Sequence, residues 1–462
     1  MRSSSLVVLC LVTVSFMDAA LTAACGGGGD DAHAGDAGTN DGALDELGPD
    51  ARTTGDASTG DGGSGVVEYH DIASAASWSA FDLADFNPDF ANRSTFFGGA
   101  FDGRYVYLNP LQRTYAGDGG FGFVSSIMVR YDTRAAFGAG SSWSEFDIGS
   151  VNPFAGGYVS AAFDGRYLHV SGSSSSKYMA RYDTQAPFAA KGSWSTSEIP
   201  PSPPETYSGD GYYGLAFDGR YVHSGPLAQT SPLVRHDTQS SDQDAGWSKF
   251  DDTKLTPPGL RTRGAIFDGR YVYFVPGTDG IVANGVAVRY DTLAPYDDAG
   301  AWRSFDLRSL NPKAKAFAGG SFDGRYVYFA PFYQNGAQTG TVARLDTQGA
   351  FDAATSWTTF DLAPVVPGPT IYCGSVFDGR FLWLVPNRDG RVARLDTTRP
   401  FGDAASWSSF DMMTIHPKGL VFQGAVFDGE FVYFVPAQLS VVLRFHARTP
   451  AALPPSYHGS TF

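Results

Sequence analysis

The chain has 462 residues, of which 43% are hydrophobic and 14% aromatic, and its formal net charge is -15. That length and composition provide enough apolar surface for a large core, and the acidic balance argues against nucleic acid as a partner, because no basic patch is available to neutralise phosphates. The 56 Gly and 27 Pro, together with 35 Phe and 23 Tyr, favour many short aromatic strands joined by turns over helices.

The first 24 residues have the pattern of a signal peptide. Arg2 provides a positively charged start, and residues 6–17 form an apolar run that is shorter than a membrane-spanning helix requires. Residues 21–25 resemble the lipobox of bacterial lipoproteins, although Thr22 stands three places before the Cys, where Leu is usual. We expect Cys25 to carry a lipid that anchors the exported chain at the bacterial cell surface. Ordinary secretion after cleavage nearby is the alternative.

Residues 25–66 are expected to form a disordered acidic tether. Between Gly26 and Val66 the chain has nine acidic residues, one Arg and no aromatic residue, among Gly, Ala, Ser and Thr. Such a segment cannot bury enough apolar surface to offset the entropy of ordering. Of the three cysteines, Cys10 lies in the signal peptide and Cys25 is the candidate anchor, which leaves Cys373 without a disulfide partner.

A repeated motif follows the tether. The sequence Phe-Asp-Gly occurs seven times, at Phe101, Phe163, Phe217, Phe267, Phe322, Phe377 and Phe427. A period near 50 residues indicates one supersecondary unit copied in series. In the unit around Phe267, residues 264–267 and 270–276 flank an Asp-Gly hairpin signal, and residues 286–292 and 301–307 predict two further strands. Four antiparallel strands in each of seven units predict an all-β, seven-bladed propeller.

The two ends of the array complement each other. Six units have a fourth strand that begins with Trp, at Trp143, Trp194, Trp247, Trp302, Trp357 and Trp407. The seventh unit lacks this strand, whereas residues 77–83, which include Trp78, supply a spare one before the first unit. We therefore expect the N-terminal strand to complete the last blade and close the ring, which leaves no large open sheet edge. The propeller is predicted to span residues 67–450, followed by a tail at 451–462.

The unit resembles the Kelch-type propeller repeat. Its third strand ends in Tyr-Asp and a Trp follows in the fourth, as in Tyr131-Asp132 and Trp143. The Gly-Gly that follows the second strand in that family is replaced here, for example by Val275-Pro276. The resemblance implies a propeller that binds at one face, and it implies no activity, because propellers host many functions.

The most regular polar residues of the repeat are interpreted as structural. Asp and Gly meet the geometric needs of the turn. The Arg that follows the turn in six units is predicted to pair with the Asp of the third strand, for example Arg270 with Asp291, because both change in the seventh unit, to Glu430 and His446. Such an exposed pair contributes about 0–1 kcal/mol.

Binding residues are expected where the repeats differ. The position four residues before each motif Phe holds seven different residues, Phe97, Val159, Tyr213, Arg263, Ala318, Cys373 and Gln423. We expect this ring to contact a ligand at the mouth of the central channel, and Arg263, its one charge, suits an anionic group. Relaxed constraint at a solvent-facing rim is the alternative. The loops after the second strands add Tyr115, Phe121 and Tyr333, which suit a sugar or peptide unless they pack over their own blades.

No catalytic or metal-binding pattern accompanies the repeats. The eight His lack metal-ligand spacing, and no nucleophile elbow or phosphate-binding loop occurs. We expect a monomeric surface module that binds an extracellular glycan or protein, needs no cofactor, and touches the membrane only through Cys25. The alternative is a lyase or glycoside hydrolase that acts on an extracellular polymer at the channel mouth, which requires paired titratable groups there.

Overall fold

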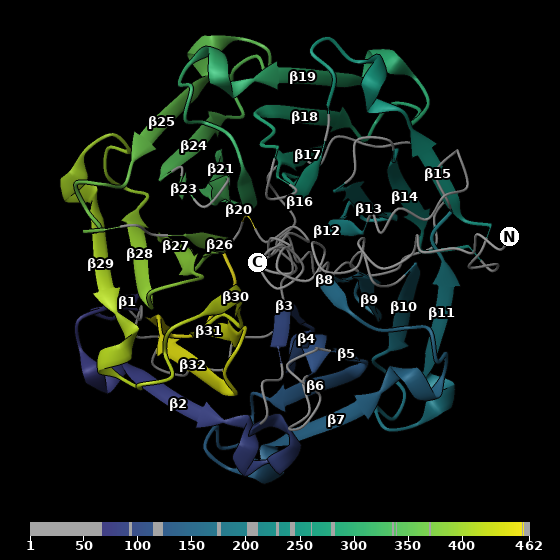
Figure 1. The fold of residues 1–462 in the computed structure, drawn as a ribbon, viewed down its shortest axis with the longest axis vertical. Helices are drawn as coiled ribbons and strands as arrows, with labels where there is room; N and C mark the ends of the chain where they lie inside the picture. The colour runs from purple at the N-terminus through teal and green to yellow at the C-terminus, as the bar shows by residue number, and fades with distance from the viewer. Residues whose placement is uncertain are drawn as a thin grey trace, which may run out of the picture.

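The structure is a computed structural model that describes residues 67–91, 95–113, 123–172, 177–200, 211–227, 231–240, 245–259, 261–278, 282–334, 337–338, 340–368, 371–454 and 456. These residues form β-strands and short 3₁₀ helices, with no α-helix among them. Seven of the sheets stand around a common axis as a closed ring (Figure 1), and two small two-stranded sheets accompany them. The prediction of an all-β, seven-bladed propeller is confirmed.

Each blade is an antiparallel sheet that runs from the axis outwards. The first three blades consist of β3 (Thr95–Phe101), β4 (Tyr105–Arg113), β6 (Ile127–Asp132) and β7 (Trp143–Asp147); β8 (Tyr158–Phe163), β9 (Tyr167–Gly172), β10 (Tyr178–Asp183) and β11 (Trp194–Glu198); and β12 (Tyr212–Phe217), β13 (Tyr221–Pro226), β14 (Leu233–Asp237) and β15 (Trp247–Phe250). In the first blade, β5 (Phe123–Val124) also pairs with β4.

The next three blades follow in the same order. They consist of β16 (Thr262–Phe267), β17 (Tyr271–Pro276), β18 (Val286–Asp291) and β19 (Trp302–Asp306); β20 (Phe317–Phe322), β21 (Tyr326–Pro331), β24 (Thr341–Asp346) and β25 (Trp357–Asp361); and β26 (Tyr372–Phe377), β27 (Phe381–Pro386), β28 (Arg391–Asp396) and β29 (Trp407–Asp411). A small hairpin, β22 (Tyr333–Gln334) with β23 (Ala337–Gln338), extends from the fifth blade.

The seventh blade joins the two ends of the propeller. It consists of β30 (Phe422–Phe427), β31 (Phe431–Pro436), β32 (Val441–His446) and, from the start of the chain, β2 (Trp78–Asp82). Trp78 lies opposite Phe445 in this pairing. A second contact joins β1 (Glu68–Tyr69) to β33 (Arg448–Thr449). The N-terminal strand therefore closes the ring, as the sequence predicted.

Short 3₁₀ helices flank the fourth strands. They are η1 (Ala75–Ser77), η2 (Leu83–Asp85), η3 (Pro88–Ala91), η4 (Gly140–Ser142), η5 (Ile148–Ser150), η6 (Lys191–Ser193), η7 (Asp252–Lys254), η8 (Ala299–Ala301), η9 (Leu307–Ser309), η10 (Ala354–Ser356), η11 (Ala404–Ser406) and η12 (Met412–Thr414). Those that follow a fourth strand often begin at its last Asp, whose side chain accepts from a backbone N–H, as Asp306 does from Arg308.

The Asp of each Phe-Asp-Gly turn holds its hairpin together. In the first blade, Asp102 Oδ1 accepts from the backbone N–H groups of Arg104 and Tyr105, and Asp102 Oδ2 accepts from the Tyr107 hydroxyl at 2.6 Å. The same three bonds recur around the ring, with His169, His223 and Trp383 in place of the Tyr in three blades. The motif is therefore accounted for by local structure.

The innermost strands are crowded at the axis. In the third blade the pairing of β12 with β13 shifts register between Tyr213 and Ala216, and Gly214 occupies this bulge with φ of 78°. A Cβ on Gly214 would lie 2.4 Å from the Cα of Gly264 in the next blade. The small residue at this position is thus required by the close approach of neighbouring blades.

The outer seams are closed by stacked aromatic rings. The Trp that begins one fourth strand stacks on a Phe of the preceding blade's fourth strand, as Trp194 does on Phe146 with centroids 4.9 Å apart. The other stacked pairs are Phe81–Trp143, Phe250–Trp302, Phe305–Trp357, Phe360–Trp407 and Phe410–Trp78. Aromatic pairs of this kind contribute about 0.5–1.5 kcal/mol beyond the area they bury.

Candidate functional site

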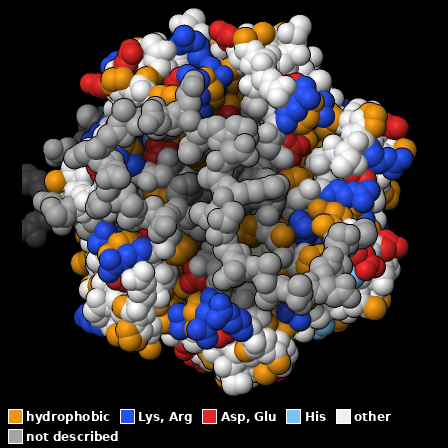
Figure 2. Space-filling model, turned by 180° about the vertical axis from the view of Figure 1, so that it is seen from behind, with side chains coloured by type: hydrophobic (Ala, Val, Ile, Leu, Met, Phe, Trp, Pro, Cys, Tyr) orange, Lys and Arg blue, Asp and Glu red, His pale blue; other side chains and the backbone are white. Residues whose placement is uncertain are grey.

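The predicted ion pairs are present in all six blades that carry them. The Arg after the turn lies 2.7–2.8 Å from the third-strand Asp in Arg104–Asp132, Arg166–Asp183, Arg220–Asp237, Arg270–Asp291, Arg325–Asp346 and Arg380–Asp396. In the seventh blade Glu and His replace the Arg and the Asp, and Glu430 Oε1 lies 3.2 Å from His446 Nε2. On the face shown in Figure 2, Lys and Arg side chains form separate groups around the disc.

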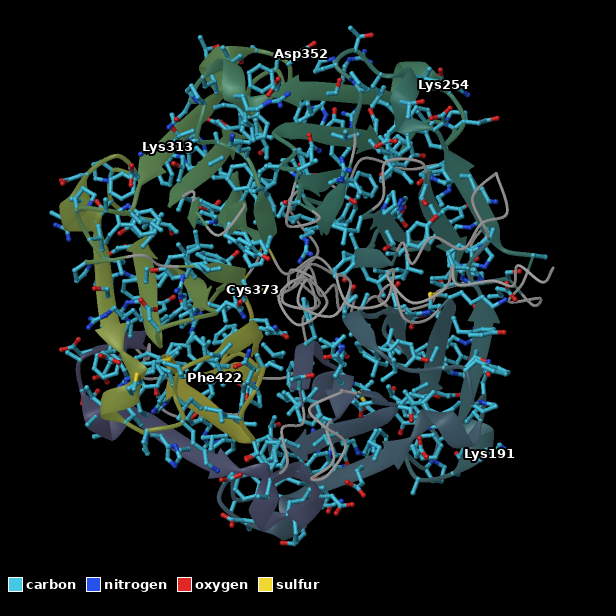
Figure 3. All side chains as sticks on the ribbon, in the orientation of Figure 1. Lys191, Lys254, Lys313, Asp352, Cys373 and Phe422 are labelled. Atoms are coloured by element: carbon cyan, nitrogen blue, oxygen red, sulfur yellow. The ribbon has the colours of Figure 1, made fainter. Side chains whose placement is uncertain are left out.

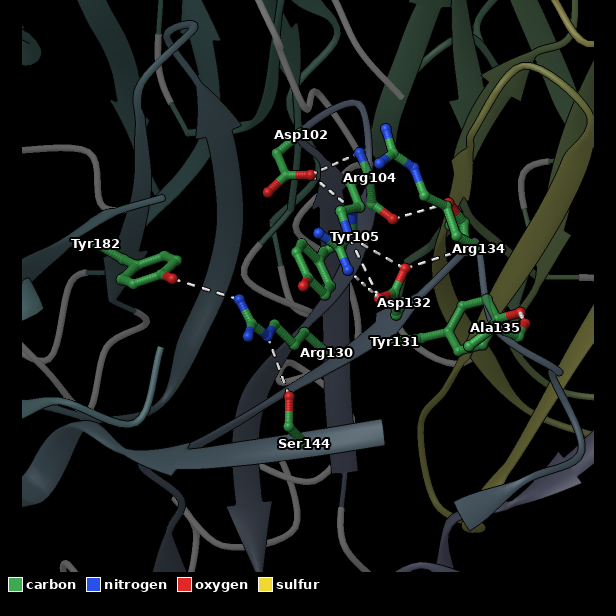
Figure 4. Close-up of polar contacts among 11 residues, drawn as sticks. Asp102, Arg104, Tyr105, Arg130, Tyr131, Asp132, Arg134, Ala135, Ser144 and Tyr182 are labelled. Carbon is green, nitrogen blue, oxygen red and sulfur yellow. Dashed lines mark hydrogen bonds and ion pairs between the residues drawn. The ribbon is translucent and has the colours of Figure 1, made fainter. Parts of the chain in front are cut away.

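A second Arg, in the third strand, contacts an aromatic ring of the next blade in five of the seven blades, which sequence reasoning missed. Arg130 packs over the ring of Tyr105 in its own blade and over Phe188 in the next, at 3.9 and 4.1 Å. It also donates to Ser144 and to the Tyr182 hydroxyl of the next blade (Figure 4). The signal was available, because Arg begins the conserved third-strand motif. These contacts account for Arg130 as a structural residue of the seam.

Most of the diverse ring residues pack together in one cluster. Five of them, Phe97, Val159, Tyr213, Ala318 and Cys373, belong to one apolar cluster with Leu111, Phe332, Tyr333 and Ile371. Figure 3 shows Cys373 near the centre of the propeller, whereas Lys191, Lys254 and Lys313 lie at its outer edge. All seven ring residues are buried, with exposed fractions of 0–4%.

Arg263 is the charged member of this axial cluster. Its guanidinium carbon lies 5.0 Å from the ring centre of Tyr213 and 5.3 Å from that of Phe332, and its Nε donates to the Thr278 carbonyl at 2.8 Å. Burial raises the pKa of Tyr213, and the nearby charge of Arg263 opposes that rise. A cation held between aromatic faces is stabilised by their quadrupoles.

Two amide side chains at the axis have acceptor oxygens to spare. Asn109 donates to the Phe97 carbonyl at 3.0 Å, and its Oδ1 has no hydrogen-bond partner among the described residues. Gln423 Oε1 also has no hydrogen-bond partner within the described part of the chain. Both side chains are at least 96% buried. A buried acceptor without a donor is costly, and a bound group or water that donates to it removes that cost.

The other predicted site residues divide into two groups. Tyr333 is 3% exposed and packs against Phe332 with ring centres 4.5 Å apart, so it joins the axial cluster. Tyr115, Phe121 and the candidate lipid site Cys25 lie outside the described residues.

One expectation about Cys373 is wrong. The sequence pattern leaves Cys373 without a disulfide partner, but this residue is disulfide-bonded. The other two cysteines of the chain, Cys10 and Cys25, lie outside the described residues. The count of three cysteines could not reveal the bond, because two of them had been assigned to export and anchoring.

The third blade contains an unexpected buried acid. The position five residues after the Trp that begins the fourth strand is aliphatic and buried in six blades, as Leu83, Ile148, Ile199, Leu307, Leu362 and Met412. In the third blade it is Asp252, which is 2% exposed and whose Oδ2 has no hydrogen-bond partner among the described residues. Burial, helped by the charge of Asp251, raises the pKa of Asp252 to about 8. The departure was visible in the aligned repeats, but it was not singled out.

The described residues show neither a metal centre nor a membrane helix. Within them, no three His, Cys, Asp or Glu side chains are grouped so that they could hold a metal ion. No helix in the described part of the chain is long and apolar enough to cross a membrane.

Comparison with known proteins identifies the architecture. No family model and no curated protein matches the sequence. Among solved structures, the chain is similar to a catalytically inactive variant of virginiamycin B lyase from Staphylococcus aureus with quinupristin, with a TM-score of 0.53 and 12% identity over 80% of this chain and 98% of that one. It is also similar to the Swd1 β-propeller domain of Myceliophteria thermophila, with a TM-score of 0.50 and 10% identity over 77% of this chain and 98% of that one. At these identities the likeness shows the propeller fold alone.

Proposed function

We propose that the protein is an exported binding module whose ligand site is the axial cluster. The observation that carries the proposal is the contrast between a regular scaffold and an irregular centre. Hairpin turns, ion pairs and stacked rings repeat around the propeller, whereas the position four residues before the motif Phe holds seven different residues, five of which pack in one apolar cluster. A purely structural position in a repeat array would be filled uniformly, as the stacked Phe and Trp positions mostly are.

The chemistry of the cluster indicates the class of ligand. Arg263 supplies a cation between two aromatic rings, and Asn109 and Gln423 supply buried acceptor oxygens. An extracellular glycan or peptide with an anionic group and several hydroxyl or amide donors complements this set. Because the ring residues are at most 4% exposed, ligand entry must rearrange the side chains at the mouth.

A binding screen tests the site. The exported chain is applied to an array of acidic and neutral glycans and to extracellular peptides, beside the variants Arg263→Gln and Arg270→Gln. Loss of Arg263 should weaken binding of an anionic ligand at least about tenfold, which corresponds to about 1.4 kcal/mol. Arg270→Gln removes the same charge from an exposed ion pair and should leave binding unchanged.

The same screen separates the alternatives. Equal binding by both variants, at matched melting temperature, would remove the axial cluster from consideration. Release of product from any polymer in the array would favour a lyase or glycoside hydrolase over a binding module. Arg263 is buried and also contributes to packing, so a second variant is needed. Gln423→Leu removes one acceptor oxygen and changes the side-chain volume little.

We also propose that Cys25 is the lipid-bearing residue that places the module at the bacterial cell surface. The support is the lipobox-like segment at residues 21–25 and the acidic composition of residues 26–66. Cys373 is disulfide-bonded. A cysteine that carries a thioether-linked lipid cannot be its partner, so lipidation of Cys25 excludes a bond between Cys25 and Cys373. Mass spectrometry of unreduced peptides decides it. A lipidated N-terminal peptide is expected, and a peptide that joins residue 25 to residue 373 would contradict anchoring through Cys25.

A further inference from the structure

The junction between the N-terminal segment and the seventh blade contains two stacked imidazoles. The rings of His70 and His446 have centroids 4.1 Å apart and planes inclined by 29°. On its other side, His446 stacks on Phe431 at 4.7 Å. His70 immediately follows β1, and its backbone N–H donates to the Ala447 carbonyl. This stack therefore bridges the entry of the propeller and the end of its last repeat.

The polar atoms of the two rings converge on one hydroxyl. The Nε2 atoms of His70 and His446 lie 3.3 and 3.1 Å from Thr449 Oγ1, and His446 Nε2 is 3.2 Å from Glu430 Oε1. A hydroxyl has a single proton to donate. All three contacts have a donor when the Nε2 proton of His446 is shared between Glu430 Oε1 and Thr449 Oγ1, and the Thr449 hydroxyl donates to an unprotonated Nε2 of His70. Protonation of both rings leaves the hydroxyl proton without an acceptor and places two cations face to face.

This junction differs from the corresponding place in the other blades. In the other six blades the positions of Glu430 and His446 hold Arg and Asp, as in Arg270 and Asp291. That ion pair does not titrate between pH 5 and 8. Only the seventh blade, the one assembled from both ends of the chain, has His and Glu instead. Histidine is the side chain whose ordinary pKa falls within that range.

The surrounding charges oppose protonation in sum. Burial, the neighbouring His70 ring and Arg444 on the same strand lower the pKa of His446, while Asp428 acts in the opposite direction. Glu430 faces His446 from the turn before β31. From β28, Arg394 donates to the His70 carbonyl at 3.2 Å.

Two further charged groups lie close to the stack. Arg448 of β33 packs over Tyr69, 5.4 Å from its ring centre. Asp71 stands beside His70 in sequence and interacts electrostatically with Arg394. The stack therefore has cations on three strands and acids at the turn and beside His70.

We propose that His70 and His446 form a pH-sensitive clasp, which holds residues 67–71 against the seventh blade at neutral pH and releases them in acid. Because folding favours the neutral form of His446, the clasp contributes fully above about pH 6.5 and is lost as the pH falls through the lower pKa of the folded state. Strand β2 and the rest of the ring stay in place, since they are held by their own ladder and by the packing of Trp78. In an acidic environment, residues 67–71 would thus be added to the predicted tether of the exported chain.

Hydrogen exchange of the intact exported chain tests the clasp. Protection factors, corrected for the pH dependence of intrinsic exchange, are measured between pH 7.5 and 5.0 for peptides that cover residues 68–77 and 447–453. They should decrease progressively as the pH falls below 6.5 and be at least about tenfold lower at pH 5.0 than at pH 7.5. A peptide that covers β18 should show constant protection across the same range.

The repeat itself supplies the matched control. The double variant Glu430→Arg with His446→Asp restores the ion pair of the other six blades. It should fold, and its protection factors should not fall in acid. His70→Gln keeps a group that can hydrogen-bond to Thr449 but removes the second imidazole. Its acid-induced fall in protection should be smaller than that of the parent. Unchanged protection in the original chain at pH 5.0, or an equal step in the double variant, would overturn the proposal.

Discussion

At the level of single residues, the turn Asp shows how one side chain serves different electrostatic surroundings. Burial alone would raise the pKa of Asp164, but the hydrogen bond and charge of His169 hold it below the ordinary value. In the sixth blade the partner is the neutral indole of Trp383, and burial raises the pKa of Asp378 to about 6. The motif is constant in sequence, whereas its protonation depends on the residue five positions later.

Asp252 provides the clearest prediction at this scale. Its pKa is raised in the folded state, so the protonated form is favoured by folding, and the resulting stability is present at low pH and lost as the pH rises to about 8. The free energy of unfolding should fall by up to about 1.4 kcal/mol for each pH unit in the interval between the unfolded and folded pKa values. Asp252→Asn should remove this dependence and be more stable than the parent at pH 8.

Denaturant unfolding between pH 5 and 9 measures this effect. Asp352→Asn, on an exposed loop at the outer edge, provides the control and should follow the parent at every pH. A constant difference between Asp252→Asn and the parent across the range would show that Asp252 is ionised in the folded protein.

At the level of elements, the seams between blades are similar but unequal. The stacking Phe of the fourth strand is replaced by Ser197 in the second blade, so Trp247 has no Phe on which to stack. Trp247 is only partly buried, and its Nε1 has no hydrogen-bond partner among the described residues. Trp78, in contrast, is 7% exposed, stacks on Phe410 and donates to the Ile72 carbonyl.

These differences predict unequal costs for the same substitution. Trp78→Ala should lower the free energy of unfolding by about 3–5 kcal/mol, the usual loss for a buried Trp. Trp247→Ala should cost distinctly less, because fewer packing contacts and no indole hydrogen bond to a described residue are lost. Thermal and denaturant unfolding of the two variants provide the comparison, and equal losses would mean that the seam between the second and third blades is as well packed as the closing one.

Sequence reasoning located the strands well and the seams poorly. Asp-Gly turns and strands ending in Pro marked the hairpins, because those signals depend on local backbone geometry. The bulge at Gly214 and the stacking of Arg130 between two blades were not foreseen as such, since both arise from the approach of neighbouring blades. The pairing of Arg270 with Asp291 was predicted only because the array contains a blade in which both positions change together.

For the whole molecule, closure by the N-terminal strand makes the ends of the propeller adjacent. Glu68 lies opposite Thr449, and β2 is the outermost strand of a blade whose other three strands come from the C-terminal end. Removal of β2 would expose the edge of β32 and open the ring. Its place in the sheet, and not its place in the sequence, is what the fold requires.

A circular permutant tests this conclusion. A chain that begins at Thr95, joins residue 454 to residue 67 through a flexible linker and ends at Ala91 keeps every strand pairing of the ring. It should fold with a melting temperature within a few degrees of that of the parent chain. A second permutant that also lacks residues 67–91 should be strongly destabilised and prone to association. If both permutants behave alike, β2 is dispensable and closure is not the source of stability.

The sequence by itself determined the number of blades, the order of their strands and the origin of the closing strand, because repeated turn and strand signals are local and the spare Trp strand is visible in the pattern. It also indicated which position would gather at the axis. Only the tertiary structure decided that this ring is a buried apolar cluster around Arg263, that Cys373 is disulfide-bonded, and that His70 meets His446. These outcomes depend on contacts between residues far apart in the chain, which follow from the closure of the ring and not from any local preference.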